Sequence, residues 1–297
     1  MDKKKNILVV GGTGFLGKHI LKKSLKLGYS PTSISLKKPT KIKKIRGVNY
    51  ITLDIRKKKE FRKIIIKFDY VVNVGGYGGI KKKFNPYEGI ESQYIGLKNL
   101  AGYFLNKKLK KFVQIGSSLE YGNNKSPNLE NMVSKLPLTD YGKVKLKATN
   151  HLRFFYRFYD FPVVILRLYQ VYGPGQDKNR LLGYLLNSIK NKKNIKVTKG
   201  DQMRDFLFVS DFTEALFRCL KEKKTDGEII NIGQGSPIKI KKLISKTIKF
   251  FSVKKNRIKF SIKNTEIKTL YPSIDKAKKL IKWKPKIKIE TGLRKLF

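Results

Sequence analysis

Three glycines spaced three residues apart, Gly11, Gly14 and Gly17, separate a short apolar segment from an amphipathic one. The segment Asn6 to Val10 has the length and β-branched character of a buried strand, and Phe15 to Leu27 has apolar residues at helical spacing. In this context the first glycine permits a tight turn, the second lets a pyrophosphate approach the backbone, and the third lets helix and strand pack closely. The helix N-terminus favours phosphate charge. The chain is therefore predicted to begin with a dinucleotide-binding βαβ unit of the Rossmann type.

Short apolar segments alternate with amphipathic ones up to about residue 170. Strands are predicted at 32–36, 48–53, 70–74, 112–115 and 163–168, and helices at 89–105 and 141–159. This alternation predicts an α/β fold with a doubly wound parallel sheet and right-handed crossovers. We expect residues 1–170 to form the cofactor-binding domain. Residues 171–297 are expected to form mainly a smaller C-terminal substrate-binding lobe, with segments that return to the first domain.

The end of the second predicted strand indicates which dinucleotide is bound. An Asp or Glu at this position binds the adenosine ribose of NAD, whereas a basic residue accommodates the 2′-phosphate of NADP. The strand ends in Ser35-Leu36-Lys37-Lys38 and carries no acidic residue. We therefore expect NADP as the cofactor, with NAD possible, and Lys37 and Lys38 beside the adenosine ribose.

Tyr141 and Lys145 lie one helical turn apart at the start of the predicted helix 141–159. This spacing is a weak signal in a chain with 15 Tyr and 57 Lys, but this pair follows the strand that ends at Ser117. Ligands of open α/β sheets bind at such strand ends. A nearby ammonium lowers the pKa of a phenol, so Tyr141 suits proton transfer to a developing alkoxide. Ser117 is expected to hydrogen-bond the same substrate oxygen, and all three residues are candidate catalytic groups.

Taken in chain order, these residues resemble the extended short-chain dehydrogenase/reductase family, in its NAD(P)-dependent nucleotide-sugar epimerase, dehydratase and reductase branch. The resemblance covers nearly the whole chain and includes the serine segment 116–122, the segment 166–175 and Arg204-Asp205-Phe206. Together with the two lysines, it implies cofactor contacts for Gly11, Thr13, Gly14, Phe15, Leu16, Gly17, Lys37, Lys38, Asp54, Ile55, Gly75, Tyr141, Lys145 and Leu168. It implies nucleotide-sugar contacts for Ser117, Ser118, Gln170 and Arg204.

Arg204 is expected to clamp the diphosphate, and a structural ion pair with Asp205 or Asp211 is the alternative. Gln170 stands where the family usually has asparagine, so the geometry at the sugar is expected to differ.

Departures from the family pattern narrow the expected activity. Dehydratases place an acidic pair directly after the catalytic serine, where this chain has Ser118 and Leu119. Reductases that also epimerise C3 and C5 place a cysteine where Leu119 stands, whereas the single Cys219 lies elsewhere. The epimerases that the chain resembles usually carry the NAD-selecting acid. We therefore expect a reductase of a nucleotide-linked 4-keto-6-deoxyhexose in surface-polysaccharide synthesis. A nucleotide-sugar 4-epimerase similar to UDP-glucose 4-epimerase is the alternative.

The net charge of +47 raises the question of a polyanionic partner. Only 11 of the 68 basic residues are Arg, although nucleic-acid readout favours Arg, and the Lys residues are spread along the whole chain. We therefore expect a lysine-rich background and no specific nucleic-acid partner. A non-catalytic, RNA-binding relative of the fold is kept as a further alternative.

The remaining expectations concern location and assembly. A single cysteine excludes an internal disulfide and fits a reducing, cytoplasmic setting. No apolar segment approaches the ~18 residues of a membrane span, so no membrane insertion is expected. The two histidines have no partner at metal-ligand spacing, so no metal site is expected. The family resemblance implies a homodimer.

Overall fold

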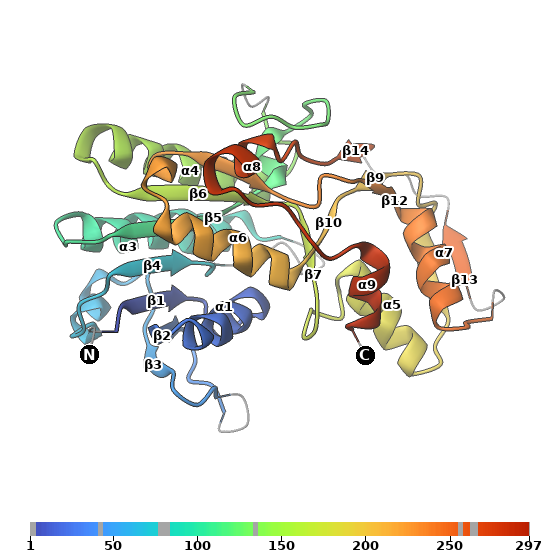
Figure 1. The fold of residues 1–297 in the computed structure, drawn as a ribbon, viewed down its shortest axis with the longest axis horizontal. Coiled ribbons are helices and arrows are strands. Elements are labelled where there is room, and N and C mark those ends of the chain that lie inside the picture. Colours follow the sequence, from blue (N-terminus) through green and yellow to red (C-terminus); the bar gives the residue numbers. More distant parts are fainter. Residues whose placement is uncertain are drawn as a thin grey trace.

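A seven-stranded parallel sheet forms the centre of the computed structural model, which describes residues 4–40, 44–76, 84–132, 136–254, 258–261 and 267–296 (Figure 1). The strand order is β3-β2-β1-β4-β5-β6-β11. The strands are β1 (Asn6–Val10), β2 (Ser30–Ser35), β3 (Asn49–Thr52), β4 (Tyr70–Asn73), β5 (Lys111–Ser117), β6 (Val163–Leu168) and β11 (Ile229–Ile232). The predicted doubly wound α/β fold is confirmed, because the order reverses at β1, between β2 and β4.

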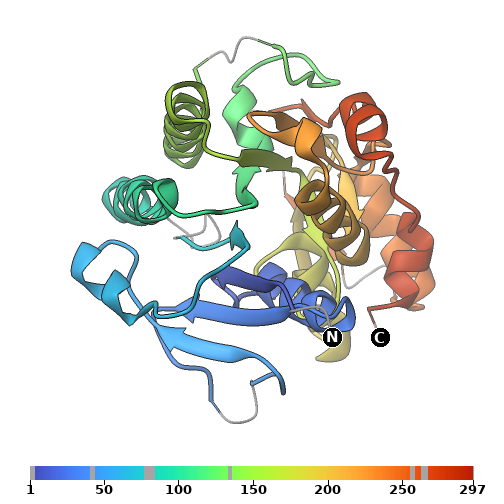
Figure 2. The ribbon, with the colours of Figure 1, turned by 60° about the vertical axis from the view of Figure 1, so that its left-hand side comes forward.

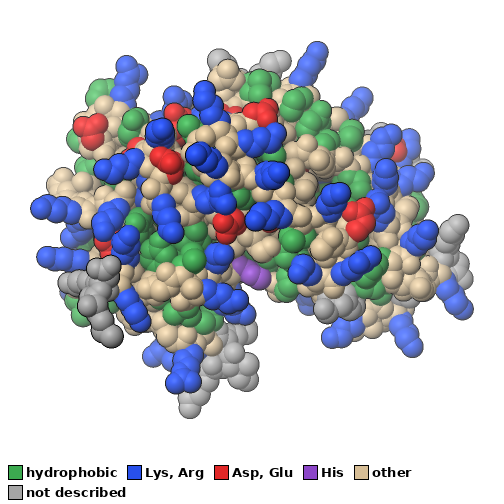
Figure 3. Space-filling model, viewed as in Figure 1, with side chains coloured by type: hydrophobic (Ala, Val, Ile, Leu, Met, Phe, Trp, Pro, Cys, Tyr) green, Lys and Arg blue, Asp and Glu red, His purple; other side chains and the backbone are tan. Residues whose placement is uncertain are grey.

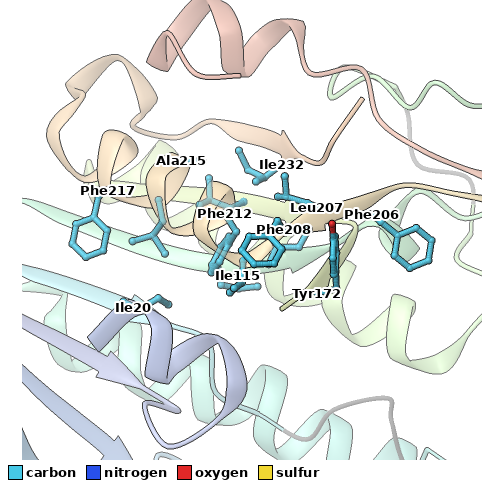
Figure 4. Close-up of a cluster of buried hydrophobic side chains, with 14 of the residues drawn as sticks. Ile20, Ile115, Tyr172, Phe206, Leu207, Phe208, Phe212, Ala215, Phe217 and Ile232 are labelled. Atoms are coloured by element: carbon cyan, nitrogen blue, oxygen red, sulfur yellow. The ribbon is translucent and has the colours of Figure 1, made fainter. Parts of the chain in front are cut away.

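Helices cover both faces of this sheet (Figure 2). The helices α1 (Phe15–Lys26) and α6 (Val209–Lys221) lie on one face, and α3 (Gly96–Leu105) and α4 (Asp140–Tyr159) lie on the other. Neighbouring residues of β1 point to opposite faces, as a strand requires. Ile7 packs in the cluster that includes α1 and α6, and Leu8 packs in the cluster that includes α3 and α4. Figure 4 shows part of the first cluster, to which Phe212 of α6, Ile115 of β5 and Ile232 of β11 contribute.

The helix predicted at 89–105 begins earlier and is not a uniform α-helix. It consists of α2 (Pro86–Gly89), a π-helical turn η3 (Ile90–Ile95) and α3. The earlier start has a local cause: Asn85 Oδ1 accepts a hydrogen bond of 3.0 Å from Tyr87 N, and Pro86 occupies the first helical position. The other predicted elements of the first 170 residues agree with the structure to within a few residues at their ends.

Residues after 170 form small sheets beside the large one, on the right of Figure 1. Two of these sheets have two strands, β10-β7 and β13-β8, and one has three, β12-β9-β14. Their strands are β7 (Gln170–Tyr172), β8 (Ile195–Thr198), β9 (Met203–Arg204), β10 (Phe206–Phe208), β12 (Ile238–Lys239), β13 (Ile258–Ser261) and β14 (Thr269–Leu270). The helices of this part, besides α6, are α5 (Leu181–Lys190), α7 (Ile240–Phe250), α8 (Asp275–Ile281) and α9 (Ile289–Arg294). Since β11 pairs with β6, this half also completes the main sheet.

Candidate active site

A cavity of about 730 Å³, here called the central cavity, lies at the C-terminal ends of β1, β5 and β6. This is where open parallel sheets bind ligands. The predicted residues that line it are Gly11, Gly14, Phe15, Leu16, Gly17, Ser117, Ser118, Tyr141, Leu168 and Gln170. The fold therefore places the glycine loop opposite the candidate catalytic side chains, although about 100 residues or more separate them in the sequence.

The glycine loop has the geometry of a phosphate site. Gly11 adopts a φ of +82°, which few other residues tolerate. A Cβ on Gly17 would lie 2.3 Å from Gly11 O, so only glycine allows α1 to approach the loop this closely. The first turn of α1 has no side-chain cap and no acidic residue. Its N–H groups and positive helix end thus remain suited to a diphosphate, and the residues present fit a dinucleotide.

A second cavity of about 440 Å³, the β2 cavity, begins at Gly11 and extends past the end of β2. The predicted residues that line it are Gly11, Thr13, Lys37, Asp54, Ile55 and Gly75. Lys38 is not among the lining residues. Arg56 donates to the Asp54 carboxylate at 2.9 and 2.7 Å, and these hydrogen bonds lower the pKa of Asp54. Arg56 also lines the cavity, but it is bonded to Asp54. Among the lysines that the structure describes, Lys37 is the one that lines this cavity.

Tyr141 and Lys145 lie on the first turns of α4, as predicted. Thr139 Oγ1 caps the helix by accepting a hydrogen bond of 3.1 Å from Gly142 N. The buried Lys145 Nζ lies 5.9 Å from the centre of the Tyr141 ring and donates to Ile115 O at 2.8 Å. Burial lowers the pKa of Lys145 to about 8, and the negative charge of Glu120 opposes this shift.

In the protein without ligands, Lys145 alone does not produce the expected lowering of the Tyr141 pKa. Burial raises the pKa of Tyr141 to about 12, and the positive charge of Arg180 opposes this rise. The edge-on Phe84 ring, 5.6 Å away between ring centres, contributes to the enclosure. Lys145 is tied to the end of β5 and does not offset this loss of solvation.

Ser117 ends β5 and faces the central cavity. Its Oγ accepts a hydrogen bond of 3.2 Å from Leu119 N, which fixes the side chain at the start of the turn η4 (Ser118–Tyr121). Ser118 and Leu119 also line the cavity, so positions 118 and 119 supply no acid to it. Cys219 is buried within α6 and does not line the cavity.

Two acidic side chains line the central cavity, and both have partners. Asp140 forms an ion pair of 3.1 Å with Lys143 on the surface of α4. Asp177 Oδ1 accepts a hydrogen bond of 2.7 Å from Asn179 N within a turn. Neither carboxylate is thus arranged as a proton donor for loss of water from a sugar.

A third cavity of about 370 Å³, the α5 cavity, adjoins the central one and shares Gln170, Gln176 and Arg180 with it. Arg204 lines this third cavity rather than the central one. Its guanidinium donates to Met203 O and Ile267 O, both at 2.8 Å. The alternative of an ion pair with Asp205 or Asp211 is therefore wrong.

Arg180 is a candidate binding residue that the sequence did not indicate. It precedes α5 and lines both the central and the α5 cavities. Among the residues that the structure describes, its guanidinium has no hydrogen-bond or ion-pair partner. Its charge acts on Tyr141. Because no motif surrounds Arg180 in the sequence, only the folded chain reveals its position.

Neither a metal-binding cluster nor a membrane-spanning helix is found in the described ranges. No group of three or more His, Cys, Asp or Glu side chains there is arranged to hold a metal ion. Within the same ranges, every helix is too short or too polar to cross a bilayer.

Known proteins are similar to this chain in sequence over nearly its whole length. UDP-glucuronate 4-epimerase of Thermodesulfobacterium geofontis is 26% identical, and the alignment covers 97% of this chain and 94% of that protein. Human dTDP-D-glucose 4,6-dehydratase is 25% identical, with 98% and 88% covered.

Solved structures of nucleotide-sugar epimerases have a fold similar to that of this chain. UDP-glucuronic acid 4-epimerase of Bacillus cereus, in complex with UDP-glucuronic acid and NAD, matches with a TM-score of 0.87 at 26% identity, covering 98% of this chain and 97% of that one. UDP-glucose 4-epimerase of Thermotoga maritima has the same fold, with a TM-score of 0.91 at 23% identity and the same coverage. The model of the NAD dependent epimerase/dehydratase family matches residues 7–233, and the chain belongs to that family.

Proposed function

We propose that this protein is a nucleotide-sugar 4-epimerase that uses a nicotinamide dinucleotide. The observation that carries the proposal is the shared cavity: Ser117 and Tyr141 face the glycine loop, and Ser118 and Leu119 replace the acidic pair that dehydration needs. Epimerisation at C4 needs a group that moves a proton at the 4-oxygen but no additional acid. The sequence alone favoured a reductase. The 4-epimerases among the relatives support the 4-epimerase alternative better, so it replaces the reductase as the main proposal.

The residues of the site have complementary roles in this proposal. A bound nicotinamide dinucleotide supplies a reversible acceptor for the hydride on C4. Tyr141 takes the proton from the 4-hydroxyl while C4 is oxidised to a ketone, and it returns the proton when the opposite face of C4 is reduced. Ser117 hydrogen-bonds the 4-oxygen in both states. The Lys145 ammonium lies 5.9 Å from the centre of the Tyr141 ring, and its charge, together with that of an oxidised nicotinamide when bound, would lower the Tyr141 pKa from its raised value in the protein without ligands.

We propose that the nucleotide diphosphate lies along the α5 cavity. Arg180, at the junction with the central cavity, would hold the diphosphate, and Arg204 lines the far part. The relatives named above act on UDP- or dTDP-sugars, so UDP-hexoses are the first substrates to test. NAD is bound by the Bacillus cereus epimerase and is the cofactor proposed for this activity.

A reductase that uses NADPH is the second candidate function. One observation favours it: Lys37 lines the β2 cavity, and no acidic residue stands at the end of β2. A lysine there suits the 2′-phosphate of NADP.

Two assays separate these candidates. In the first, the purified protein is incubated with single UDP-, dTDP-, GDP- and CDP-hexoses without a reductant, and the 4-epimers are separated by chromatography. In the second, NADPH absorbance is followed with a nucleotide-linked 4-keto-6-deoxyhexose. Interconversion without NADPH consumption supports the epimerase, and NADPH oxidation without interconversion supports the reductase. The absence of both overturns both.

We further propose that the protein is a dimer. Four aromatic side chains on the C-terminal half of α4 are exposed, and Phe154 contacts two of the others, Phe158 and Tyr159; the fourth is Tyr156. Covering such a patch is favourable. Light scattering of the wild type and of Phe158→Glu tests this: the variant is expected to be a monomer, and a monomeric wild type would refute the proposal.

The RNA-binding alternative gains no support from the face of the molecule shown in Figure 3. Figure 3 shows Lys and Arg side chains scattered over the face in view rather than gathered into one patch. A scattered charge attracts polyanions without a defined site. RNA affinity, measured against salt concentration, is therefore expected to vanish near physiological salt.

A further inference from the structure

A carboxylate lies behind the catalytic serine, where it is enclosed by three different elements. Glu120 belongs to η4 and is fully buried, with 0% of its surface exposed. Its Oε1 accepts a hydrogen bond of 2.6 Å from Ser117 N at the end of β5. Its Oε2 accepts from Thr149 Oγ1 of α4 at 2.8 Å and from Arg167 Nε of β6 at 2.9 Å. One carboxylate thus connects the serine, the helix of Tyr141 and the adjacent strand.

The surroundings are built to hold this charge. Gly116 lies opposite Arg167 in the β5–β6 pairing, and a Cβ on Gly116 would come within 2.7 Å of Glu120 Oε1. The Arg167 guanidinium lies 4.3 Å from the centre of the Tyr121 ring, and Tyr121 donates a hydrogen bond of 2.8 Å to Asn231 Oδ1. The aromatic ring that packs on the Arg167 guanidinium is therefore itself held by a hydrogen bond.

Such a buried pair is a costly way to fill space. Removing two charges from water costs roughly several kcal/mol per ion. Packed apolar side chains of similar volume would avoid this cost. A role in packing alone would not require it. The position of the negative charge, next to the serine and close to the dyad, provides a reason for it.

The charges near the dyad come from several elements. Glu120 acts on both Lys145 and Tyr141, and it raises the pKa of each. Arg180, before α5, acts on Tyr141 in the opposite direction. On α4 itself, Asp140 is paired with Lys143 on the surface.

The elements α3 and η3 pack on α4, and their charged groups act on residues other than Tyr141 and Lys145. Lys98 of α3 acts on His151, and Tyr94 of η3 contacts Lys147. Glu91 of η3 acts on Arg56. Glu120 is thus the carboxylate that acts on Lys145.

We propose that Glu120 is a positioning residue: its buried carboxylate fixes Ser117 at the end of β5 and keeps the Lys145 ammonium charged beside Tyr141. The inference rests on the roles proposed above for Ser117, Tyr141 and Lys145. Glu120 does not line the cavity, so it acts through these residues rather than on the sugar.

The variant Glu120→Gln tests the charge while it keeps the size and the Oε1 acceptor. Without the negative charge, Lys145 loses its proton at lower pH, and Tyr141 also becomes more acidic. Both limbs of the pH–rate profile are therefore expected to move to lower pH. A purely structural role would lower the rate at every pH and leave the limbs in place.

Two further variants separate this effect from loss of the fold. Glu120→Gln leaves the buried Arg167 unpaired, which destabilises proteins. The double variant Glu120→Gln/Arg167→Met removes both charges, so it is expected to fold and to keep the shift. Asp226→Asn is the matched control, because it removes the carboxylate partner of buried Lys111 at the other end of β5.

The direct readout is the titration of Lys145 by NMR in protein labelled with ¹³C-lysine, assigned by its loss in Lys145→Met. A lysine that titrates at about 8 stands apart from surface lysines, which titrate near ~10.4. We expect the Lys145 titration to fall by about half a pH unit or more in both Glu120 variants and to stay unchanged in Asp226→Asn. An unchanged titration in both Glu120 variants overturns the inference. A shifted titration in a protein that converts no nucleotide sugar overturns the proposed function but not the effect of Glu120 on Lys145.

Discussion

The Lys145 ammonium lies 5.9 Å from the centre of the Tyr141 ring, one helical turn away, and is anchored by a hydrogen bond of 2.8 Å to Ile115 O. Ile115 lines the central cavity but Lys145 does not, so this hydrogen bond holds the ammonium beside the cavity rather than in it. Tyr141, by contrast, faces the cavity and the glycine loop. The two side chains therefore divide their work: Tyr141 exchanges a proton with the substrate, and Lys145 supplies a fixed charge.

Replacing Tyr141 by Phe removes the phenol and keeps the ring contact with Phe84. General acid–base groups contribute about 10²–10⁴-fold to rate, so kcat is expected to fall by about that factor. The fold and the cofactor affinity should not change. Steady-state kinetics and dinucleotide titration by fluorescence measure both. Turnover at the wild-type rate would remove Tyr141 from the mechanism.

The charge of Lys145 predicts a pH dependence of turnover. Burial lowers the pKa of Lys145 to about 8, so the ammonium is present below this pH and is lost above it. Turnover is expected to decline as the pH rises through about 8. Lys145→Met, which has no charge at any pH, should be slow and should lack this decline. A wild-type profile that stays flat up to about pH 9.5 would show that the ammonium is not needed.

The sequence was sufficient to locate candidate site residues where they form a contiguous pattern. The loop from Gly11 to Gly17 and the Tyr141–Lys145 spacing are local patterns, and each follows or begins an element that its own periodicity predicts. The parallel sheet then brings Ser117 to the same cavity, because strands of one direction end at one edge.

The sequence was insufficient where function depends on contacts between distant residues. Arg180 became a candidate only because the loop before α5 returns to the end of β5. The high pKa of Tyr141 depends on its burial, which the Tyr-x-x-x-Lys spacing does not encode. Arg204 matches a family motif, yet its guanidinium donates to backbone carbonyls of β9 and of residue 267. Acceptors of this kind have no signature in the sequence.

Arg180 provides a test of the proposed diphosphate site. Arg180→Gln removes a cation that lines both the central and the α5 cavities. A hydrogen bond to a charged group contributes about 1.5–3 kcal/mol, so KM is expected to rise about 10- to 100-fold. The matched control is Lys178→Gln, which alters an exposed cation two residues away that lines neither cavity. Equal KM values for the two variants would contradict the assignment.

Lys37 and Lys38 provide a matched pair for cofactor choice. Lys37 lines the β2 cavity, whereas Lys38 does not. Lys37→Gln is expected to weaken NADP binding several-fold more than NAD binding, because Lys37 is a cation at this cavity and Arg56, which also lines it, is bonded to Asp54. Lys38→Gln should leave the ratio of the two Kd values unchanged. Calorimetric titration with both dinucleotides measures the ratio. A ratio that responds only to Lys38→Gln would show that the wrong lysine was assigned.

Asp205 predicts a dependence of stability on pH away from the catalytic groups. Asp205 is fully buried, and burial raises its pKa from 3.8 to about 6, although backbone N–H groups of residues 234–236 oppose this rise. A raised pKa in the folded state means that its stabilisation is complete below about pH 3.8 and is lost as the pH rises through about 6.

Asp205→Asn mimics the neutral carboxyl at every pH. Its free energy of unfolding, relative to the wild type, is therefore expected to increase between pH 4 and 7 by up to about 3 kcal/mol. Urea unfolding at several pH values measures this difference. A difference that does not vary with pH would show that Asp205 titrates normally in the folded protein.

The most direct measurement of the proposed function follows the hydrogen on C4 of a nucleotide sugar. The protein is incubated in D₂O with UDP-galactose or UDP-galacturonic acid, with NAD and without a reductant, and the products are analysed by proton NMR. A 4-epimerase that uses Tyr141 for the proton and returns the hydride is expected to give the 4-epimer with hydrogen, not deuterium, at C4. Deuterium at C4, or no 4-epimer from any of the UDP-, dTDP-, GDP- or CDP-hexoses tested in the same way, would contradict the proposal.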